Sequence, residues 1–223
     1  MMDFTPILIS LKTASLSIFI TFFLGLFAAK KILNLKSEKW KMIWDGIFTL
    51  PLVLPPTVAG FFLLYIFGVK RPFGNFLMDY FGVKIAFSFF ATVLAAVVIS
   101  FPLMYRSARG AFEQVDQNLI YAGRTLGMKE SSIFFKILMP NAMPGIVSGG
   151  VLAFARGLGE FGATAMIAGN IAGRTRTLPL AVYSAVAAGD MDTAYKYVLI
   201  LVAVSLIVVS FMNYYHYWVK KRR

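Results

Sequence analysis

The chain has 223 residues, of which 59% are hydrophobic and 14% charged, and its mean hydropathy is +0.74. A soluble domain usually carries about 25% charged residues, so this composition indicates a membrane protein. The net charge of +12 does not indicate nucleic-acid binding, because the Lys and Arg residues stand in short clusters between long apolar blocks. With no cysteine and one histidine, the chain excludes disulfides, thiolate metal sites and clusters of histidine ligands, so no metal site is expected.

Five apolar blocks are long enough to cross a hydrocarbon core about 30 Å thick, which takes about 20 helical residues. They cover residues 6–28, 44–68, 85–105, 141–168 and 195–218. The fourth block is rich in glycine and carries two charges, so we expect it to be kinked or broken. The stretch 178–189 is too short to cross and predicts a short external or re-entrant helix, with a sixth span as the alternative. The sequence therefore predicts an all-α polytopic membrane protein, one transmembrane domain over residues 1–223 with about five spans.

The basic residues predict the orientation of these spans. With five spans, residues 30–42, 105–140 and 220–223 share one side and hold fourteen Lys and Arg residues, against five in the opposite loops. Cytoplasmic loops are enriched in Lys and Arg, so we expect the N-terminus outside and the C-terminus in the cytoplasm. A sixth span would place part of this charge outside, which favours five. The aromatic residues from Tyr214 to Trp218 precede the basic tail and predict anchoring at the lipid headgroups.

Two blocks contain residues that could shape a path through the membrane. Pro51, Pro55 and Pro56 remove amide donors from the second block, which predicts a kink and freed carbonyl groups or a cavity. In the fourth block, Arg156 and Glu160 are spaced i, i+4 and would share a helix face. A charge inside a span costs about 2.5–3.5 kcal/mol on insertion scales, so both should face protein or water. Either Arg156 helps to pass an anion, or the two residues form a structural ion pair.

The hydrophilic segment 110–140 is too long for a simple turn. Its apolar spacing predicts two short amphipathic helices, and the break between them falls at Gly127, since glycine accepts the positive φ of a helix C-terminus. Such a helix–glycine–helix elbow could insert into a groove of a partner protein. It could equally be an interfacial hairpin that has no partner, and the residues by themselves leave both possibilities open.

The spacing within this segment resembles the "EAA" loop of the permeases of ATP-binding-cassette (ABC) importers. That loop has Glu-Ala-Ala, three residues, Gly, nine residues and Ile-x-Leu-Pro. The matching positions here are Tyr121, Ala122, Gly123, Gly127, Ile137 and Pro140. Tyr replaces Glu at the first position, Gly replaces the second Ala, and Met139 replaces Leu. In the family this loop is the coupling helix that docks on the ATPase subunit.

Further stretches resemble the molybdate, tungstate and sulfate branch of this family, and in particular the molybdate permease. They are residues 50–58, 100–104, 154–164 and 169–179. The resemblance implies a membrane-spanning permease subunit that translocates molybdate across the inner membrane by alternating access. It implies a homodimer, cytoplasmic ABC ATPase subunits and an extracytoplasmic oxyanion-binding protein as partners. The candidate translocation path comprises Pro55, Pro56, Arg156, Glu160 and Thr164, and the candidate receptor contact comprises Arg174 and Arg176.

The chain lacks the phosphate-binding loop Gly-x-x-x-x-Gly-Lys-Ser/Thr. We therefore expect no enzyme activity and no cofactor in this subunit, with ATP and magnesium bound by the separate ATPase. Transport of tungstate or sulfate is the first alternative function. A secondary transporter is the second, but it would require internal repeats and several ion-coupling groups in the spans, and Glu160 is the one acid deep in a predicted span.

Overall fold

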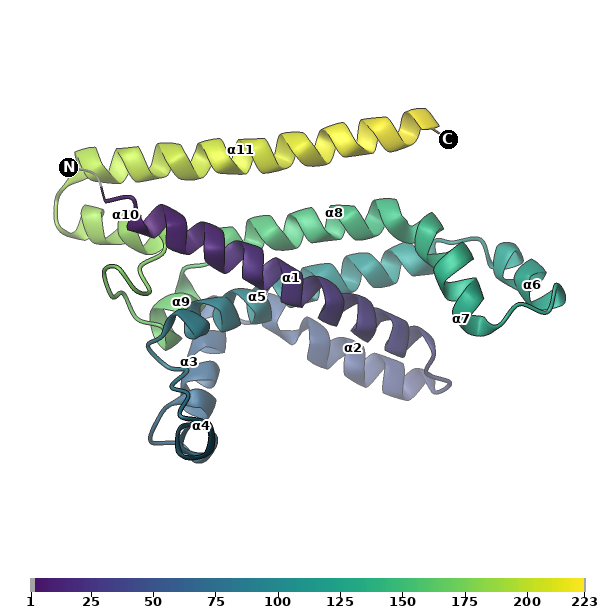
Figure 1. Ribbon diagram of the computed structural model, residues 1–223, viewed down its shortest axis with the longest axis horizontal. Coiled ribbons are helices and arrows are strands. Elements are labelled where there is room, and N and C mark those ends of the chain that lie inside the picture. The colour runs from purple at the N-terminus through teal and green to yellow at the C-terminus, as the bar shows by residue number, and fades with distance from the viewer. Residues whose placement is uncertain (1–2, 223) are drawn as a thin grey trace.

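The computed structural model describes residues 3–222, with side chains up to Tyr215, so the predicted headgroup anchors after Tyr215 lie outside the described side chains. The described chain is a bundle of helices without a β-strand (Figure 1). The elements are α1 (Thr5–Leu33), α2 (Glu38–Val53), α3 (Pro56–Phe67), α4 (Pro72–Phe81), α5 (Phe89–Glu113), α6 (Gln117–Thr125), α7 (Glu130–Ile133), the π-helical turn η1 (Phe134–Leu138), α8 (Met139–Leu158), α9 (Gly162–Ile167), α10 (Leu178–Ala187) and α11 (Met191–Arg222).

Four helical stretches within the described residues are long and apolar enough to cross a membrane. They are α1, α5, the continuous stretch Glu130–Leu158, and α11. The pair α2 and α3 forms a fifth if it counts as one span, although its two helices meet at 110°. The predicted all-α membrane fold with about five spans is thus confirmed. Helix α10, at ten residues, is too short to cross.

The helix ends differ from the apolar blocks at two places. Helix α5 begins at Phe89 and extends to Glu113, eight residues beyond the predicted block, so it carries the third span directly into the hydrophilic segment. Helices α7 and α8 and the π-helical turn between them form one stretch, and the predicted second helix of the elbow therefore merges with the fourth span. That span then breaks at residues 159–161 before α9, as its glycines suggested.

Proline determines the bend between α2 and α3. Leu54 is extended, with ψ at 141°, because the ring of a following proline disfavours the helical conformation. Pro56 then occupies the first turn of α3, where its missing N–H has no helical acceptor in any case. One apolar block consequently becomes two helices of different direction.

The long helices run along the long axis of the molecule, and the two termini lie at its opposite ends (Figure 1). The turn between α1 and α2, the α6–α7 elbow and the end of α11 lie toward one end, while the start of α1 and the turn between α10 and α11 lie toward the other. Within the described residues, the α1–α2 turn, the elbow and the end of α11 are therefore on the same side of the bundle.

Helices α1 and α5 are parallel neighbours joined by buried hydroxyl groups. Thr13 Oγ1 lies 2.9 Å from Thr92 Oγ1, and Thr21 Oγ1 lies 3.2 Å from Ser100 Oγ. Both pairs have the same sequence separation, 79 residues, which fixes the parallel direction of the two helices. Hydrogen bonds of this kind between membrane helices contribute about 0.6 kcal/mol each.

The small residues of α8 face α5. A Cβ on Gly145 would lie 2.7 Å from the Cβ of Ala111, and one on Gly149 would overlap the side chain of Ser107. Glycine is therefore needed for the close approach of the two helices, as in other small-xxx-small rows. The row serves packing inside one subunit.

Candidate functional site

The elbow between α6 and α7 is built from a capped helix and a left-handed glycine. Asp116 caps α6 by accepting a hydrogen bond from Asn118 N at 2.9 Å. At the other end, Met128 N donates to Gly123 O and Gly127 N donates to Arg124 O, which is the hydrogen-bond pattern of a Schellman motif. Gly127 has φ of +70°, so the chain turns where the sequence placed the break.

A salt bridge closes the elbow across its glycine. Arg124 Nε lies 2.7 Å from Glu130 Oε1, and Arg124 Nη2 lies 3.3 Å from Glu130 Oε2. The hydrogen bond to this carboxylate raises the pKa of the Arg124 guanidinium above its ordinary value. The pair links the two arms of the elbow. Because both side chains are exposed, it contributes little to stability.

Gly123 allows the two arms to pack closely. A Cβ at this position would lie 2.9 Å from Ile137 Cδ1 and 3.2 Å from Ile133 Cγ1. The glycine that replaces the second alanine of the family motif thus brings α6 against the second arm of the elbow, which consists of α7 and the π-helical turn η1. Pro140 lies just beyond this contact, and it lacks an N–H for the helical ladder. The ladder widens before it: Met139 N donates to Phe134 O, five residues back.

The elbow is anchored on α1 and leaves an apolar face exposed. Lys30 Nζ lies 3.8 Å from the centroid of the Phe134 ring, a cation–π contact between the end of α1 and the second arm. On α6, Tyr121 is 56% exposed and Leu126, at its C-terminal end, is 80% exposed. Ala122 is exposed as well. This face is available to another protein.

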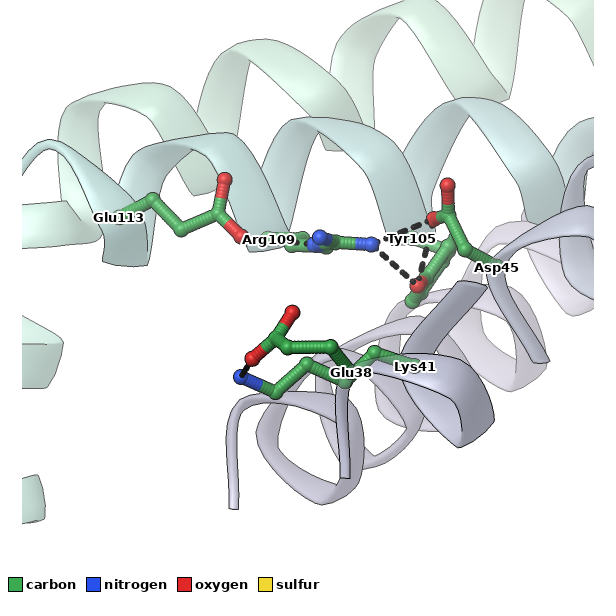
Figure 2. Close-up of polar contacts among 6 residues, drawn as sticks. All are labelled: Glu38, Lys41, Asp45, Tyr105, Arg109 and Glu113. Carbon is green, nitrogen blue, oxygen red and sulfur yellow. Dashed lines mark hydrogen bonds and ion pairs between the residues drawn. The ribbon is translucent and has the colours of Figure 1, made fainter. Parts of the chain in front are cut away.

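A polar cluster joins α2 to α5 near the elbow, and Figure 2 shows its geometry. Asp45 Oδ1 accepts from Arg109 Nη1 at 2.7 Å and from the Tyr105 hydroxyl at 2.9 Å. Arg109 Nε donates to Glu113 Oε1 at 2.7 Å, one turn before α5 ends. Tyr105 is fully buried and also packs against Phe48 of α2, with 5.3 Å between the ring centroids. The start of the elbow is in this way tied to α2.

Sequence reasoning missed this cluster. Residues 105, 109 and 113 are spaced i, i+4, which was a sign that they share one helix face. The acid at position 45, at the edge of an apolar block, was a sign that it needs a cationic partner. Asp45 and Arg109 are 64 residues apart, so the sequence gave no sign that these two residues meet.

Replacing Asp45 with asparagine is expected to loosen α2 from α5. Since the Asp45–Arg109 pair is about one quarter to one third exposed, we expect a loss of about 1 kcal/mol and a Tm lower by roughly 2–4 °C. Glu38→Gln is the matched control, because it removes the Glu38–Lys41 pair of the same helix, in which the carboxylate side chain is 81% exposed (Figure 2). Thermal unfolding in detergent measures both variants, and equal shifts would contradict the structural role of Asp45.

The predicted pair Arg156–Glu160 forms where α8 ends. Arg156 Nη1 donates to Glu160 Oε2 at 2.9 Å, and Ala163 N donates to Glu160 Oε1 at 2.8 Å. Glu160 is only 2% exposed, while the side chain of Arg156 is 32% exposed. Both oxygens of the buried carboxylate are therefore occupied, one by the ion pair and one by the first turn of α9.

The proline bend packs against the same break. A Cβ on Gly162 would lie 3.1 Å from Pro56 Cβ, and one on Gly60 would lie 2.6 Å from Ala163 Cα. The structure thus brings Pro56 close to the Glu160 region, with Thr164 buried in α9 at 1% exposure. Pro55 is exposed at the bend itself.

The remaining predicted residues, Arg174 and Arg176, lie in the turn between α9 and α10. Thr175 is fully buried, and its Oγ1 accepts from Ile171 N at 3.0 Å. Arg176 Nε donates to Asn170 Oδ1 at 2.9 Å, whereas Arg174 is exposed. Hydrogen bonds within the turn hold its shape, and the side chain of Arg174 is exposed to solvent. In the described part of the chain, no three His, Cys, Asp or Glu side chains gather in a way that could hold a metal ion.

Comparison with known proteins identifies the family. Residues 21–223 match the model of the binding-protein-dependent transport system inner membrane component, and the chain belongs to this family. It is 43% identical to the molybdenum transport system permease protein ModB of Escherichia coli strain K12, over 92% of this chain and 90% of that one. It is 38% identical to the putative molybdenum transport system permease protein YvgM of Bacillus subtilis, over 94% and 92%.

Solved structures of ABC transporters share the fold. The inward-facing MetNI methionine transporter matches with a TM-score of 0.74 and 18% identity, over 93% of this chain and 91% of that one. A bacterial transporter involved in alginate import matches with a TM-score of 0.72 and 16% identity, over 94% and 77%. At these identities the likeness concerns the fold alone.

Proposed function

We propose that the chain is the membrane-spanning permease subunit of an ABC importer that moves molybdate across the cytoplasmic membrane. The observation that carries this proposal is the elbow: the residues of the family motif form a helix–glycine–helix corner with an exposed apolar face. The molybdenum permeases at 38–43% identity support molybdate as the substrate. Tungstate or sulfate is the alternative, and a secondary transporter is not favoured.

In this proposal the permease works as a homodimer with two ATPase subunits and an extracytoplasmic binding protein. One subunit encloses little space alone, and a two-fold symmetric pair would place a path along its axis. The uneven distribution of basic residues supports a cytoplasmic elbow and an external N-terminus. The turn that carries Arg174 and Arg176 would then face the binding protein.

The contacts suggest how closure of the ATPase pair would reach the path. The ATPase would contact Tyr121, Ala122 and the end of α6. Helix α5 connects the elbow to the membrane-spanning part of the chain. The cluster around Asp45 joins α5 to α2, so movement of α5 would carry α2 with it. Helix α2 meets α3 at Pro55 and Pro56, and α3 packs on α9 beside Glu160. Through these contacts the path would open alternately to the outside and to the cytoplasm.

Replacing Gly127 with valine tests the coupling role of the elbow. A β-branched residue at a φ of +70° is strained by about 1–2 kcal/mol. We expect co-purification of the ATPase and uptake of radiolabelled molybdate to fall by roughly 5–30-fold. Excess unlabelled tungstate and sulfate, added to the wild type, rank the substrates.

Gly82→Val is the matched control for this experiment. Gly82 also has a positive φ, +64°, and also has no atom within 4 Å of a Cβ, but it ends α4, away from the elbow. Its substitution should cost similar strain and leave ATPase association intact. Normal association and normal uptake in Gly127→Val would refute the coupling role.

A further inference from the structure

Three cations line one cavity beside the start of α5, away from the elbow. The cavity has a volume of about 380 Å³ and is lined by Lys70, Arg71 and Lys84, together with aromatic side chains that include Phe61, Tyr65 and Phe87. No carboxylate belongs to its lining. All three cations are exposed, so they are open to a ligand from outside the chain.

The concentration of charge at this place is unexpected. The loops on the N-terminal side of the bundle hold five basic residues, and three of them gather here. Arg71 stacks on an aromatic ring, with its guanidinium carbon 4.1 Å from the centroid of Tyr65. Within the described side chains no carboxylate forms an ion pair with any of the three. Like charges held together without a counterion repel, so the arrangement fits an anion that enters from outside.

One wall of the cavity is apolar and continues along α3. Phe61 is 52% exposed and Tyr65 51% exposed, both on this apolar helix. Helix α4 follows directly and carries exposed aromatic side chains, among them Phe76 and Tyr80. A short amphipathic helix with aromatic residues and flanking cations is typical of the membrane interface. The cavity thus combines an apolar wall with a group of cations, the two features that the lipid headgroup region of a membrane protein needs.

The walls of the cavity are fixed by close backbone packing. Gly74, in the first turn of α4, lies directly against the carbonyl group of Gly68, so α4 folds back onto the end of α3. Phe87 has φ of +59°, a strained conformation for a residue with a side chain, and its N–H donates to Ile167 O of α9 at 2.9 Å. The fold holds this strain while placing the Phe87 ring in the lining.

We propose that this cavity binds the headgroup of a phospholipid with a net negative charge, with an acyl chain along Phe61 and Tyr65. A free tetrahedral oxyanion would use the same cations but would gain nothing from the apolar wall. The lipid uses both halves of the cavity, which is why the geometry favours it. The proposal does not depend on which substrate the permease carries.

Native mass spectrometry of the full-length chain, purified in mild detergent with its associated subunits, tests the proposal. Phosphatidylglycerol and phosphatidylcholine are titrated separately, and we expect tighter binding of phosphatidylglycerol. Lys84→Gln should weaken that binding about fivefold, since each cation near an anionic lipid contributes on this scale, and should leave phosphatidylcholine unchanged. Lys84→Arg, which retains the charge, should bind as the wild type does.

Lys196→Gln is the matched control, because Lys196 is an exposed cation near the start of α11 that does not line the cavity. It should leave the preference for phosphatidylglycerol intact. Equal affinity of the wild type for both lipids would overturn the proposal, as would equal weakening in Lys84→Gln and Lys196→Gln. Displacement of phosphatidylglycerol by millimolar inorganic phosphate or molybdate would assign the cavity to a free oxyanion instead.

Discussion

Replacing Arg156 with glutamine is expected to destabilise the permease by about 3–5 kcal/mol, the cost of leaving a buried charge without its partner. The carboxylate of Glu160 is 2% exposed, and without Arg156 it would retain only the bond from Ala163 N. The variant should reach the membrane in much reduced amount and unfold at a lower temperature. Quantitative immunoblotting of membranes and thermal unfolding in detergent measure the two effects.

The double variant Arg156→Gln/Glu160→Gln separates a structural role from a role in the path. With both charges removed, no carboxylate is left unpaired in the interior, so we expect most of the lost stability to return. If the pair serves packing, as the two occupied oxygens indicate, uptake of molybdate should return with stability. Full stability without uptake would contradict the structural role and would assign Arg156 to the passage of the anion.

Replacing Gly60 with alanine is expected to have the second large effect. The added Cβ would lie 2.6 Å from Ala163 Cα and 2.8 Å from Ala163 O, and backbone atoms cannot move aside as a flexible side chain can. Overpacking of this kind costs about 1–3 kcal/mol. Helix α3 would be pushed away from α9, so uptake should fall even in the fraction of protein that folds.

Gly46→Ala provides the control for Gly60→Ala. Gly46 lies in α2, and a Cβ there would meet no atom within 4 Å. Alanine is favoured over glycine in a helix by about 1 kcal/mol, so this variant should be at least as stable as the wild type. Measurement of molybdate uptake per folded transporter compares the two, and unchanged uptake in Gly60→Ala would show that the α3–α9 contact does not shape the path.

The spans were predictable because the bilayer imposes a simple requirement. About 20 apolar residues are needed to cross, and charges must find a partner nearby. Block hydrophobicity therefore indicated five spans, and the i, i+4 spacing indicated the pair of Arg156 with Glu160. Gly127 was predictable for a local reason, since its break in the amphipathic pattern coincides with the residue that best adopts a positive φ.

The rest depended on contacts between distant segments. Three prolines in the second block predicted a kink, but the 110° bend also rests on the packing of Gly60 and Gly162 between α3 and α9. Helix α5 extends to Glu113, which accepts a hydrogen bond from Arg109. Arg109 also binds Asp45, 64 residues earlier in the chain. No local pattern encodes such a meeting. Helix α4 was missed because ten residues with scattered aromatics resemble an ordinary loop.

The hydroxyl groups along α1 have a consequence for the order of assembly during synthesis. Thr13 and Thr21 bond to partners that the ribosome adds 79 residues later, a delay of roughly 4–16 s at about 5–20 residues per second. Ser10 waits longer still, because it accepts from Leu178 N, 168 residues further on. During this interval the first span lies in the insertion machinery or in lipid, and these three hydroxyl groups lack their later partners. The apolar face of α1 must therefore retain it in the membrane at first. The hydroxyl groups of Thr13 and Thr21 then help to select α5 as its neighbour.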